Sequence, residues 1–421
     1  MARQMKDLSV RRSDTRKLIL GLISIGLGLL VILVFNRPFS SSTVSTFLMT
    51  PGGYTEGVMD DILVPARMSL WISGGIMILA GLYHLFVGFG KKETTFLILF
   101  SILFVFSFLV YVSADKRINI ASLFSSALSM AVPITLGAFS GILCERSGVV
   151  NIAIEGMMLM GAMVGSIVGS VTGSIWLGLI AAMLSSALLA LVHAWLSIKY
   201  KINQIISGTV INIFSTGMTS FISSMFLQNI QSLNKTPRFP NVSIPLLSKI
   251  PFFGPVLFSN SLFVYGMILL LVVLQFALFR TRWGLRLRSV GEHPKAADTL
   301  GINVYRTRYM AVILGGLVAG FGGAYFSLGS VGRFDEGMTA GKGFIGLAAM
   351  IFGGWIPFKA MLAGILFGFA DALASSVSIL RSPIPGQFIN MLPYIVTIVV
   401  LAGVVGSGSG PAAAGTPYDK E

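Results

Sequence analysis

Polar side chains interrupt the apolar stretches of this chain at three places, which are the candidate sites for chemistry. The first is the segment ERSGVVNIAIEGMML at residues 145–159, where Asn151 and Glu155 lie one helical turn apart. An unsatisfied polar group in an apolar environment is costly, so such residues either serve a function or are satisfied locally. Asn151 and Glu155 are interpreted either as lining a path for a polar solute or as capping a helix, with Glu155 binding free amides at its start.

The second place is the segment NQIISGTVINIFSTGMTS at residues 203–220. At about 100° per residue, five small or polar side chains fall within a stripe of roughly 80°. They are Gln204, Gly208, Asn212, Ser215 and Thr219. Amides and hydroxyls in one stripe suit a conduit for a neutral polar solute, such as a sugar or nucleoside. The alternative is that they mediate helix packing in a membrane, which explains Gln204 and Asn212 least well.

The third place combines the glycine-rich stretch at residues 332–354 with Asp371 downstream. Arg333, Asp335 and Glu336 are interpreted as an external gate, as a contact for a donor protein or as a solvated loop. Asp371 lies deep in an apolar run, so it should be protonated or paired, with a lysine or with backbone amides. A structural pair and proton coupling both remain open for it.

Neither a catalytic constellation nor a metal site is predicted. The segment GMTAGKG, Gly337 to Gly343, has three residues between its glycines where a phosphate-binding loop needs four. It also lacks a Ser or Thr after Lys342. Three scattered histidines and the single Cys144 offer no ligand cluster. We therefore expect a non-catalytic protein that binds no metal.

The elements that position these residues are membrane-spanning helices. Hydrophobic residues make up 54% of the 421 residues and charged residues 11%, with a mean hydropathy of +0.85, which leaves too little polar surface for a soluble protein. Apolar runs of about 17–25 residues predict twelve spans. They lie near residues 18–36, 68–89, 96–112, 121–143, 148–170, 175–198, 203–227, 261–279, 308–329, 342–354, 359–379 and 388–405. The glycine-dense segments 148–170 and 342–379 are candidates for short, broken or re-entrant structure.

A basic island between two apolar runs predicts the orientation. Residues 280–308, RTRWGLRLRSVGEHPKAADTLGINVYRTR, carry seven Lys and Arg side chains, and such density is retained in the cytoplasm. With both termini cytoplasmic, 20 of the 30 Lys and Arg residues fall on the inner side and 10 on the outer side, which favours this orientation. Within the island, Pro294 suits a first helical turn and Gly301 can end it, so a short helix outside the bilayer is predicted.

Four motifs carry a resemblance to a known family. They are ILCERSGVVNIAIEGMMLMGA, NQIISGTVIN, the basic island and EGMTAGKGFIGLAAMIFG. Together they closely resemble the permease subunits of bacterial ABC importers in the ribose and branched-chain amino acid permease superfamily, and among these the nucleoside permeases most. The similarity runs from about Asn119 to the end of the chain. The sugar branch usually carries an Asp-Leu-Ser signature at the NIAIEG position, which this chain lacks.

The resemblance implies an all-α fold, a polytopic bundle of about 10–12 spans with a short cytoplasmic coupling helix, similar to type II ABC importer permeases. It implies an N-terminal extension of about three helices at residues 1–118, a permease core at 119–406 and a cytoplasmic tail at 407–421. The family's coupling element maps onto Gly291, Glu292, His293, Pro294, Lys295, Ala296 and Ala297. No special role is expected for His293.

The resemblance also implies partners. Family permeases form a dimer, often with a paralogous subunit, on two nucleotide-binding domains that are fused in the nucleoside systems; ATP and Mg²⁺ bind to that ATPase and no cofactor binds to this chain. An extracytoplasmic lipoprotein delivers the substrate, and nucleic acid is not a partner. We therefore expect a nucleoside permease in a bacterial cell membrane. The alternatives are a ribose-like sugar permease and an ion-coupled secondary transporter that uses Glu155 or Asp371.

Overall fold

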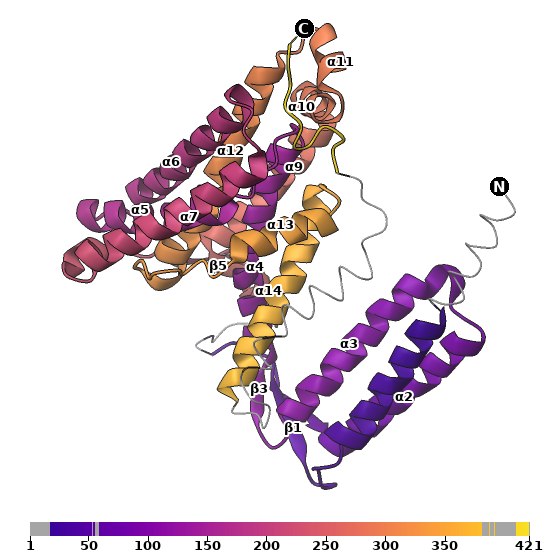
Figure 1. Ribbon diagram of the computed structural model, residues 1–421. Coiled ribbons are helices and arrows are strands. Elements are labelled where there is room, and N and C mark those ends of the chain that lie inside the picture. Colours follow the sequence, from indigo (N-terminus) through magenta and orange to yellow (C-terminus); the bar gives the residue numbers. More distant parts are fainter. Residues whose placement is uncertain are drawn as a thin grey trace, which may run out of the picture. The chain divides into compact units, whose positions relative to one another are not determined.

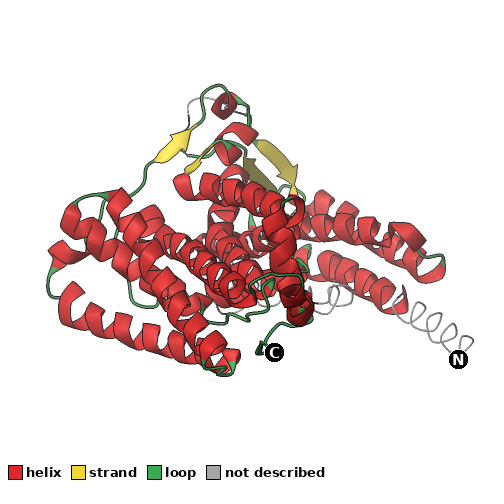
Figure 2. Ribbon diagram, turned by 90° about the horizontal axis from the view of Figure 1, so that it is seen from above, coloured by secondary structure: helices red, strands yellow, loops and turns green. Residues whose placement is uncertain are grey.

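The computed structural model describes residues 17–52, 54, 59–380, 387, 391 and 410–420. These residues contain ten helices long and apolar enough to cross a membrane, whose hydrocarbon core of about 30 Å needs about 20 residues. They are Lys17–Phe35, Ala66–Phe86 (α2), Glu93–Val112 (α3), Ile120–Glu145 (α4), Ile154–Thr172 (α5), Ile175–Ala194 (α6), Gln204–Ile222 (α7), Leu262–Arg280 (α9), Val304–Ala324 (α12) and Pro357–Ile379 (α14). Figure 2 shows how few strands accompany them. The predicted all-α polytopic fold is confirmed.

Two of the twelve predicted spans have no counterpart among these helices. The prediction of a full span at 342–354 is wrong, because α13, Lys342–Phe352, has 11 residues and is only about 16 Å long at 1.5 Å per residue. Glycines with positive φ interrupt the helix at both ends, Gly341 at 77° and Gly354 at 59°. The span predicted at 388–405 lies outside the described residues.

The helix predicted to begin at residue 148 begins instead at Ile154. Gly148 adopts a φ of +91°, which ends the turn after α4, and the next residues up to Ala153 are not helical. This stretch is therefore a broken segment, one of the forms considered for it. Its backbone groups lack helical partners, so side chains from elsewhere must satisfy them.

The chain divides into two compact units, and the first contains the described residues up to Ser122 with the end of α14 from Ser376. Its first helix, α2 and α3 lie side by side (Figure 1). A Cβ on Gly28 would lie 2.9 Å from the carbonyl oxygen of Gly74, so glycine permits close contact between the first helix and α2. A small sheet has β1, Val44–Leu48, at its centre, antiparallel to β2, Ile62–Pro65, and parallel to β3, Arg117–Asn119.

The second unit, from Leu123 onward, contains the other spanning helices. Helix α6 packs along both α5 and α12 (Figure 1), and a Cβ on Gly320 of α12 would lie 2.6 Å from the carbonyl oxygen of Ala182 in α6. The helices α6, α7 and α12 continue as π-helical turns to Lys199, Leu227 and Val331. Short elements complete the unit: β4, Asn241–Ser243, pairs antiparallel with β5, Ser259–Ser261, and α8 spans Phe253–Leu257.

The basic island forms two helices, α10, Arg282–Glu292, and α11, Pro294–Thr299. Pro294 occupies the first turn of α11, and Nδ1 of His293 accepts a hydrogen bond from the Ala296 amide at 3.1 Å. Gly301 follows with a φ of +80°. The predicted short helix within the island is confirmed, and His293, for which no role was expected, is its N-cap.

Candidate functional site

Glu155, in the first turn of α5, joins that helix to the beginning of α13. Its Oε1 accepts hydrogen bonds from Thr339 Oγ1 at 2.6 Å and from the Gly341 amide at 2.8 Å, while Oε2 accepts one from the Gly343 amide at 2.7 Å. A carboxylate at two helix N-termini also interacts favourably with both helix dipoles. The glycine-rich loop at residues 337–343, which does not match a phosphate-binding loop, therefore binds the carboxylate of Glu155.

The non-helical residues before α5 are held by side chains of α7. Gln204 Oε1 accepts a hydrogen bond from the Val150 amide at 2.6 Å. Asn212 Oδ1 accepts one from the Gly156 amide at 2.8 Å, and its Nδ2 donates to the Ile152 carbonyl at 2.9 Å. The two amides that were hardest to explain by packing thus satisfy the backbone that lacks helical partners.

The other three residues predicted to line a solute path are buried, one in the segment before α5 and two in α7. Asn151 is fully buried, and its Oδ1 accepts a hydrogen bond from the Ala153 amide at 3.0 Å. Ser215 and Thr219 are buried on the face of α7 that carries Asn212, and Thr219 Oγ1 donates to the Ser215 carbonyl at 2.7 Å. The structure therefore gathers the predicted residues between α5, α7 and α13. Their contact with a transported solute stays a prediction.

His193 of α6 belongs to this cluster, although the sequence analysis assigned it no role. Its Nδ1 lies 3.1 Å from Ser207 Oγ and its Nε2 lies 3.0 Å from the Val150 carbonyl oxygen, with the ring fully buried. One imidazole thus ties α6, α7 and the segment before α5 together. No spacing in the sequence relates His193 to Ser207 or Val150, so this contact was not predictable.

Residues at the end of α4 and directly after it hold the C-terminal end of α13. Trp355 Nε1 donates to Glu145 Oε2 at 2.6 Å, and the Arg146 guanidinium donates to the Trp355 carbonyl through Nη2 at 3.1 Å and Nε at 3.2 Å. Burial lowers the pKa of Arg146 from its usual value, while Glu292 raises it. Residues 145–155, here called the linking segment, therefore contact both ends of α13.

The linking segment also contacts the helices of the basic island. A Cβ on Gly291, near the end of α10, would lie 2.3 Å from the Arg146 carbonyl oxygen, so only glycine permits this approach. Arg308 at the start of α12 is 2% exposed and donates to the Ser147 carbonyl at 3.2 Å and to the Thr416 carbonyl at 3.1 Å. The turn after α4, the end of α10 and the start of α12 are thus packed together.

Residues 410–420, here called the tail, lie against this junction. The Ala413 amide donates to the Gly291 carbonyl at 2.9 Å, and the Tyr418 ring lies 5.4 Å from that of Tyr305. Asp419 pairs with Lys201, and this hydrogen bond raises the pKa of the lysine. The tail therefore helps to hold α10 and α12 in place.

The predicted coupling residues fall into two groups. Glu292, Lys295 and Ala296 are exposed, and Pro294 is half-buried. Gly291 and Ala297 are buried, and Ala297 packs in a cluster with Val290, Val304 and Tyr418. The exposed residues can meet another protein, whereas the two buried ones position the helices.

Asp371 of α14 forms an ion pair with Lys342, the first residue of α13. Both side chains are largely buried, at 13% and 21% exposed. The pairing expected for this acid is confirmed, with a lysine as its partner. The pair fixes the beginning of α13 to α14.

The charged residues of the glycine-rich stretch lie beside a polar cavity of about 560 Å³. Arg333 Nε donates to Asp335 Oδ1 at 2.9 Å, and Ser220 of α7 donates to Glu336. Residues 223–235 and 332–336 supply the lining. The end of α7 and the loop before α13 thus share this opening.

The ten helices of spanning length among the described residues, with the half-length α13 and the short α11, are those of a multi-pass membrane protein. Residues 123–405 match the family described as branched-chain amino acid transport system, permease component, and the chain belongs to this family.

Similar proteins of known name include ABC transporter permeases. The guanosine ABC transporter permease protein NupQ of Bacillus subtilis is 40% identical over 307 residues, which cover 70% of this chain and 95% of the relative. The nucleoside ABC transporter permease protein NupC of Lactococcus lactis is 39% identical over 309 residues, covering 70% and 96%. A putative glucose ABC transporter permease protein of Haloferax volcanii is 35% identical over 307 residues, covering 68% and 92%. No solved structure gives a significant match.

Proposed function

We propose that this chain is the permease subunit of an ATP-driven importer and carries a nucleoside across a bacterial plasma membrane. Relatives named for guanosine and nucleoside transport, at 40% and 39% identity, support the substrate class. The observation that carries the mechanism is the line of contacts from Gly291 of α10 to Arg146, and along the linking segment to the two ends of α13, where Arg146 holds Trp355 and Glu155 holds Gly341. Chains of packed side chains and hydrogen bonds of this kind can carry energetic coupling between distant sites.

In this mechanism α11 is the coupling helix, and its exposed residues dock on a cytoplasmic ATPase. Closure of the ATPase on ATP moves α11 and α10 together, and the close contact at Gly291 transfers the motion to Arg146. Because the linking segment holds both ends of α13, the half-length helix shifts with it. The polar face of α7 then borders a path that opens alternately to each side. ATP and substrate drive this change only through their different affinities for the two states.

The proposal includes further partners. The ATPase consists of two fused nucleotide-binding domains and binds the ATP and Mg²⁺. A second, paralogous permease subunit completes the pore, and an external lipoprotein delivers the nucleoside. Both termini of this chain then lie in the cytoplasm, on the same side as α10 and α11, in agreement with the seven basic residues at 280–308.

The test is uptake of radiolabelled guanosine, cytidine, ribose and glucose by proteoliposomes containing the complete complex and the lipoprotein. Nucleoside uptake should require internal ATP and persist with an uncoupler. Uptake by this chain alone that an uncoupler abolishes would show a secondary transporter instead. Uptake of sugars in preference to nucleosides would contradict the substrate class.

Replacing Ala296 with Trp or Glu292 with Arg tests the coupling helix. Because both residues are exposed, these changes should leave the permease folded; Ala296→Trp changes the exposed face of α11, whereas Glu292→Arg also removes the hydrogen bond that Glu292 Oε2 accepts from the Ala412 amide at 3.2 Å. We expect ATP hydrolysis to continue while uptake falls by at least tenfold. Unchanged uptake, with the ATPase shown by pull-down to be bound, would exclude α11 as the coupling helix.

A further inference from the structure

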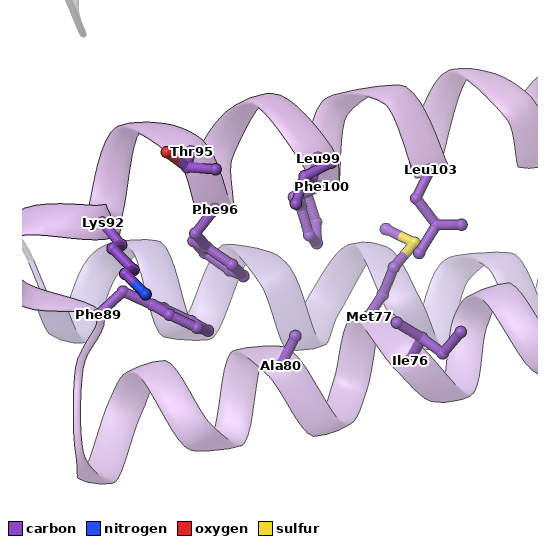
Figure 3. A pocket seen from close by; sticks show the side chains of 10 residues that line it. All are labelled: Ile76, Met77, Ala80, Phe89, Lys92, Thr95, Phe96, Leu99, Phe100 and Leu103. Carbon is purple, nitrogen blue, oxygen red and sulfur yellow. The ribbon is translucent and has the colours of Figure 1, made fainter.

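An apolar groove of about 340 Å³ runs between α2 and α3 in the first unit (Figure 3). Its floor includes Met77, fully buried, and Phe96, 7% exposed, whereas Ile76 and Leu99 on its sides are 50% and 62% exposed. Figure 3 shows these side chains pointing toward the space between the two helices. The lining is almost wholly hydrocarbon, so its occupant must be apolar along most of its length.

One end of the groove is different, because Lys92 lies there with Phe89 and Thr95 (Figure 3). Lys92 ends the short 3-10 turn that joins α2 to α3 and is exposed. Its ammonium therefore lies at the level where a spanning helix begins, which is the interface between hydrocarbon and water. Among the described residues that line it, the groove thus combines an apolar channel with one cation, Lys92, at its mouth.

The length of the groove matches one leaflet of a bilayer. From Glu93, its first residue, to Leu103, α3 advances ten residues, about 15 Å at 1.5 Å per residue. Half of a hydrocarbon core of about 30 Å is roughly 15 Å. An acyl chain that begins at the interface therefore reaches the far end of the groove.

We propose that this groove is a binding site for an anionic glycerophospholipid, with one acyl chain between α2 and α3 and the phosphate group bound by Lys92. A lysine that only extends toward water attracts anionic lipids weakly, and no more than any other exposed lysine near the membrane surface. A lysine paired with a phosphate favours lipids of net negative charge, because a zwitterionic headgroup brings its own cation to the same place. The proposal concerns the first unit and is independent of the transported substrate.

Native mass spectrometry of the purified full-length chain tests this site. The chain is mixed with equal amounts of dioleoyl phosphatidylglycerol and dioleoyl phosphatidylethanolamine, which share acyl chains and differ in charge. We expect phosphatidylglycerol to be retained at least fivefold over phosphatidylethanolamine. The variant Lys92→Gln should bring the ratio close to one, while Lys359→Gln, an exposed lysine at the beginning of α14, should leave it unchanged.

Filling the groove tests the acyl chain. Ala80→Trp places an indole in the channel and should reduce retention of both lipids by at least fivefold, whereas Leu79→Trp, on the adjacent exposed position of α2, should not. If the Ala80 variant does not fold, judged by its thermal unfolding, Ile76→Gln on the side of the groove makes the same test. Equal retention of the two lipids by the unmodified chain, or retention unaffected by Lys92→Gln or by filling the groove, would overturn the proposal.

Discussion

At the scale of single residues, the polar groups within the bundle are satisfied by backbone amides and carbonyls. Glu155 accepts three hydrogen bonds from the loop before α13, and Asn212 both accepts from and donates to the start of α5. Such groups are costly to leave unpaired in a membrane interior. Glu155 and Asn212 therefore hold broken helices in place, a role that is compatible with bordering a solute path.

Replacing Glu155 with Gln tests this role. The amide keeps one acceptor but turns a donor toward the Gly341 or Gly343 amide, which loses its partner. We expect a loss of about 1–3 kcal/mol in the free energy of unfolding. The measurement is thermal unfolding in detergent, with Glu336→Gln in the exposed loop as the control. Equal stability of the two variants would show that the loop does not depend on Glu155.

Variants of the Lys342–Asp371 pair test whether Asp371 has a structural role or carries a proton. Asp371→Asn alone leaves a largely buried lysine unpaired and should cost about 3–5 kcal/mol of stability. Replacing both residues, with Lys342→Met and Asp371→Asn, removes the unpaired charge. The double variant should therefore regain most of the lost stability. ATP-dependent uptake by the double variant should then remain within about threefold of the unmodified complex. Complete loss of uptake by a stable double variant would instead favour proton coupling through Asp371.

At the scale of elements, the linking segment is what relates the helices outside the bilayer to the half-length helix within it. Its first residues contact Gly354 and Trp355 after α13, and its last residue contacts the loop before α13. Both contacts join residues about 200 positions apart in the sequence. The position of α13 therefore depends on tertiary contacts. An 11-residue helix has little stability alone.

The tail stabilises the same junction from the side of α10 and α11. Tyr418 is 5% exposed and packs in the cluster of Val290, Ala297 and Val304, so Tyr418→Ala should leave a cavity there. We expect faster amide hydrogen exchange over residues 290–305 and lower coupling of ATP hydrolysis to uptake. Lys420→Ala, at an exposed neighbouring position, is the control. If exchange over residues 290–305 is the same in both variants, the tail does not support α11.

Apolar periodicity and turn residues predicted most elements but few of the contacts between them. Ten spans and the short helix at Pro294 follow from local signals, namely long apolar runs, a proline in a first turn and a glycine after the last. The short form of α13 was one of those considered for the glycine-dense segment 342–379, but the apolar run at 342–354 did not reveal the positive φ of Gly341 and Gly354 that bounds it. The roles of His193, Thr339 and Trp355 depend on partners far away in the sequence, which spacing does not reveal.

At the scale of the whole molecule, two kinds of helix serve two purposes. In the proposed mechanism the spanning helices provide the walls of the path, and α10 and α11 provide the surface that docks on the ATPase. Family membership covers residues 123–405, so the first unit lies almost entirely outside the matched region. Its groove, with Lys92 at the mouth, fits the proposed role in lipid binding.

The measurement that tests the central claim most directly is the number of guanosine molecules imported per ATP hydrolysed by the reconstituted complex carrying Arg146→Met. This variant keeps the apolar stem of the arginine but removes its hydrogen bonds to Gly354 and Trp355, without changing the exposed residues of α11. Arg67→Met, an exposed arginine at the beginning of α2, is the matched control. The mechanism predicts normal ATPase binding and hydrolysis with at least tenfold fewer molecules imported per ATP, and an unchanged ratio would contradict it.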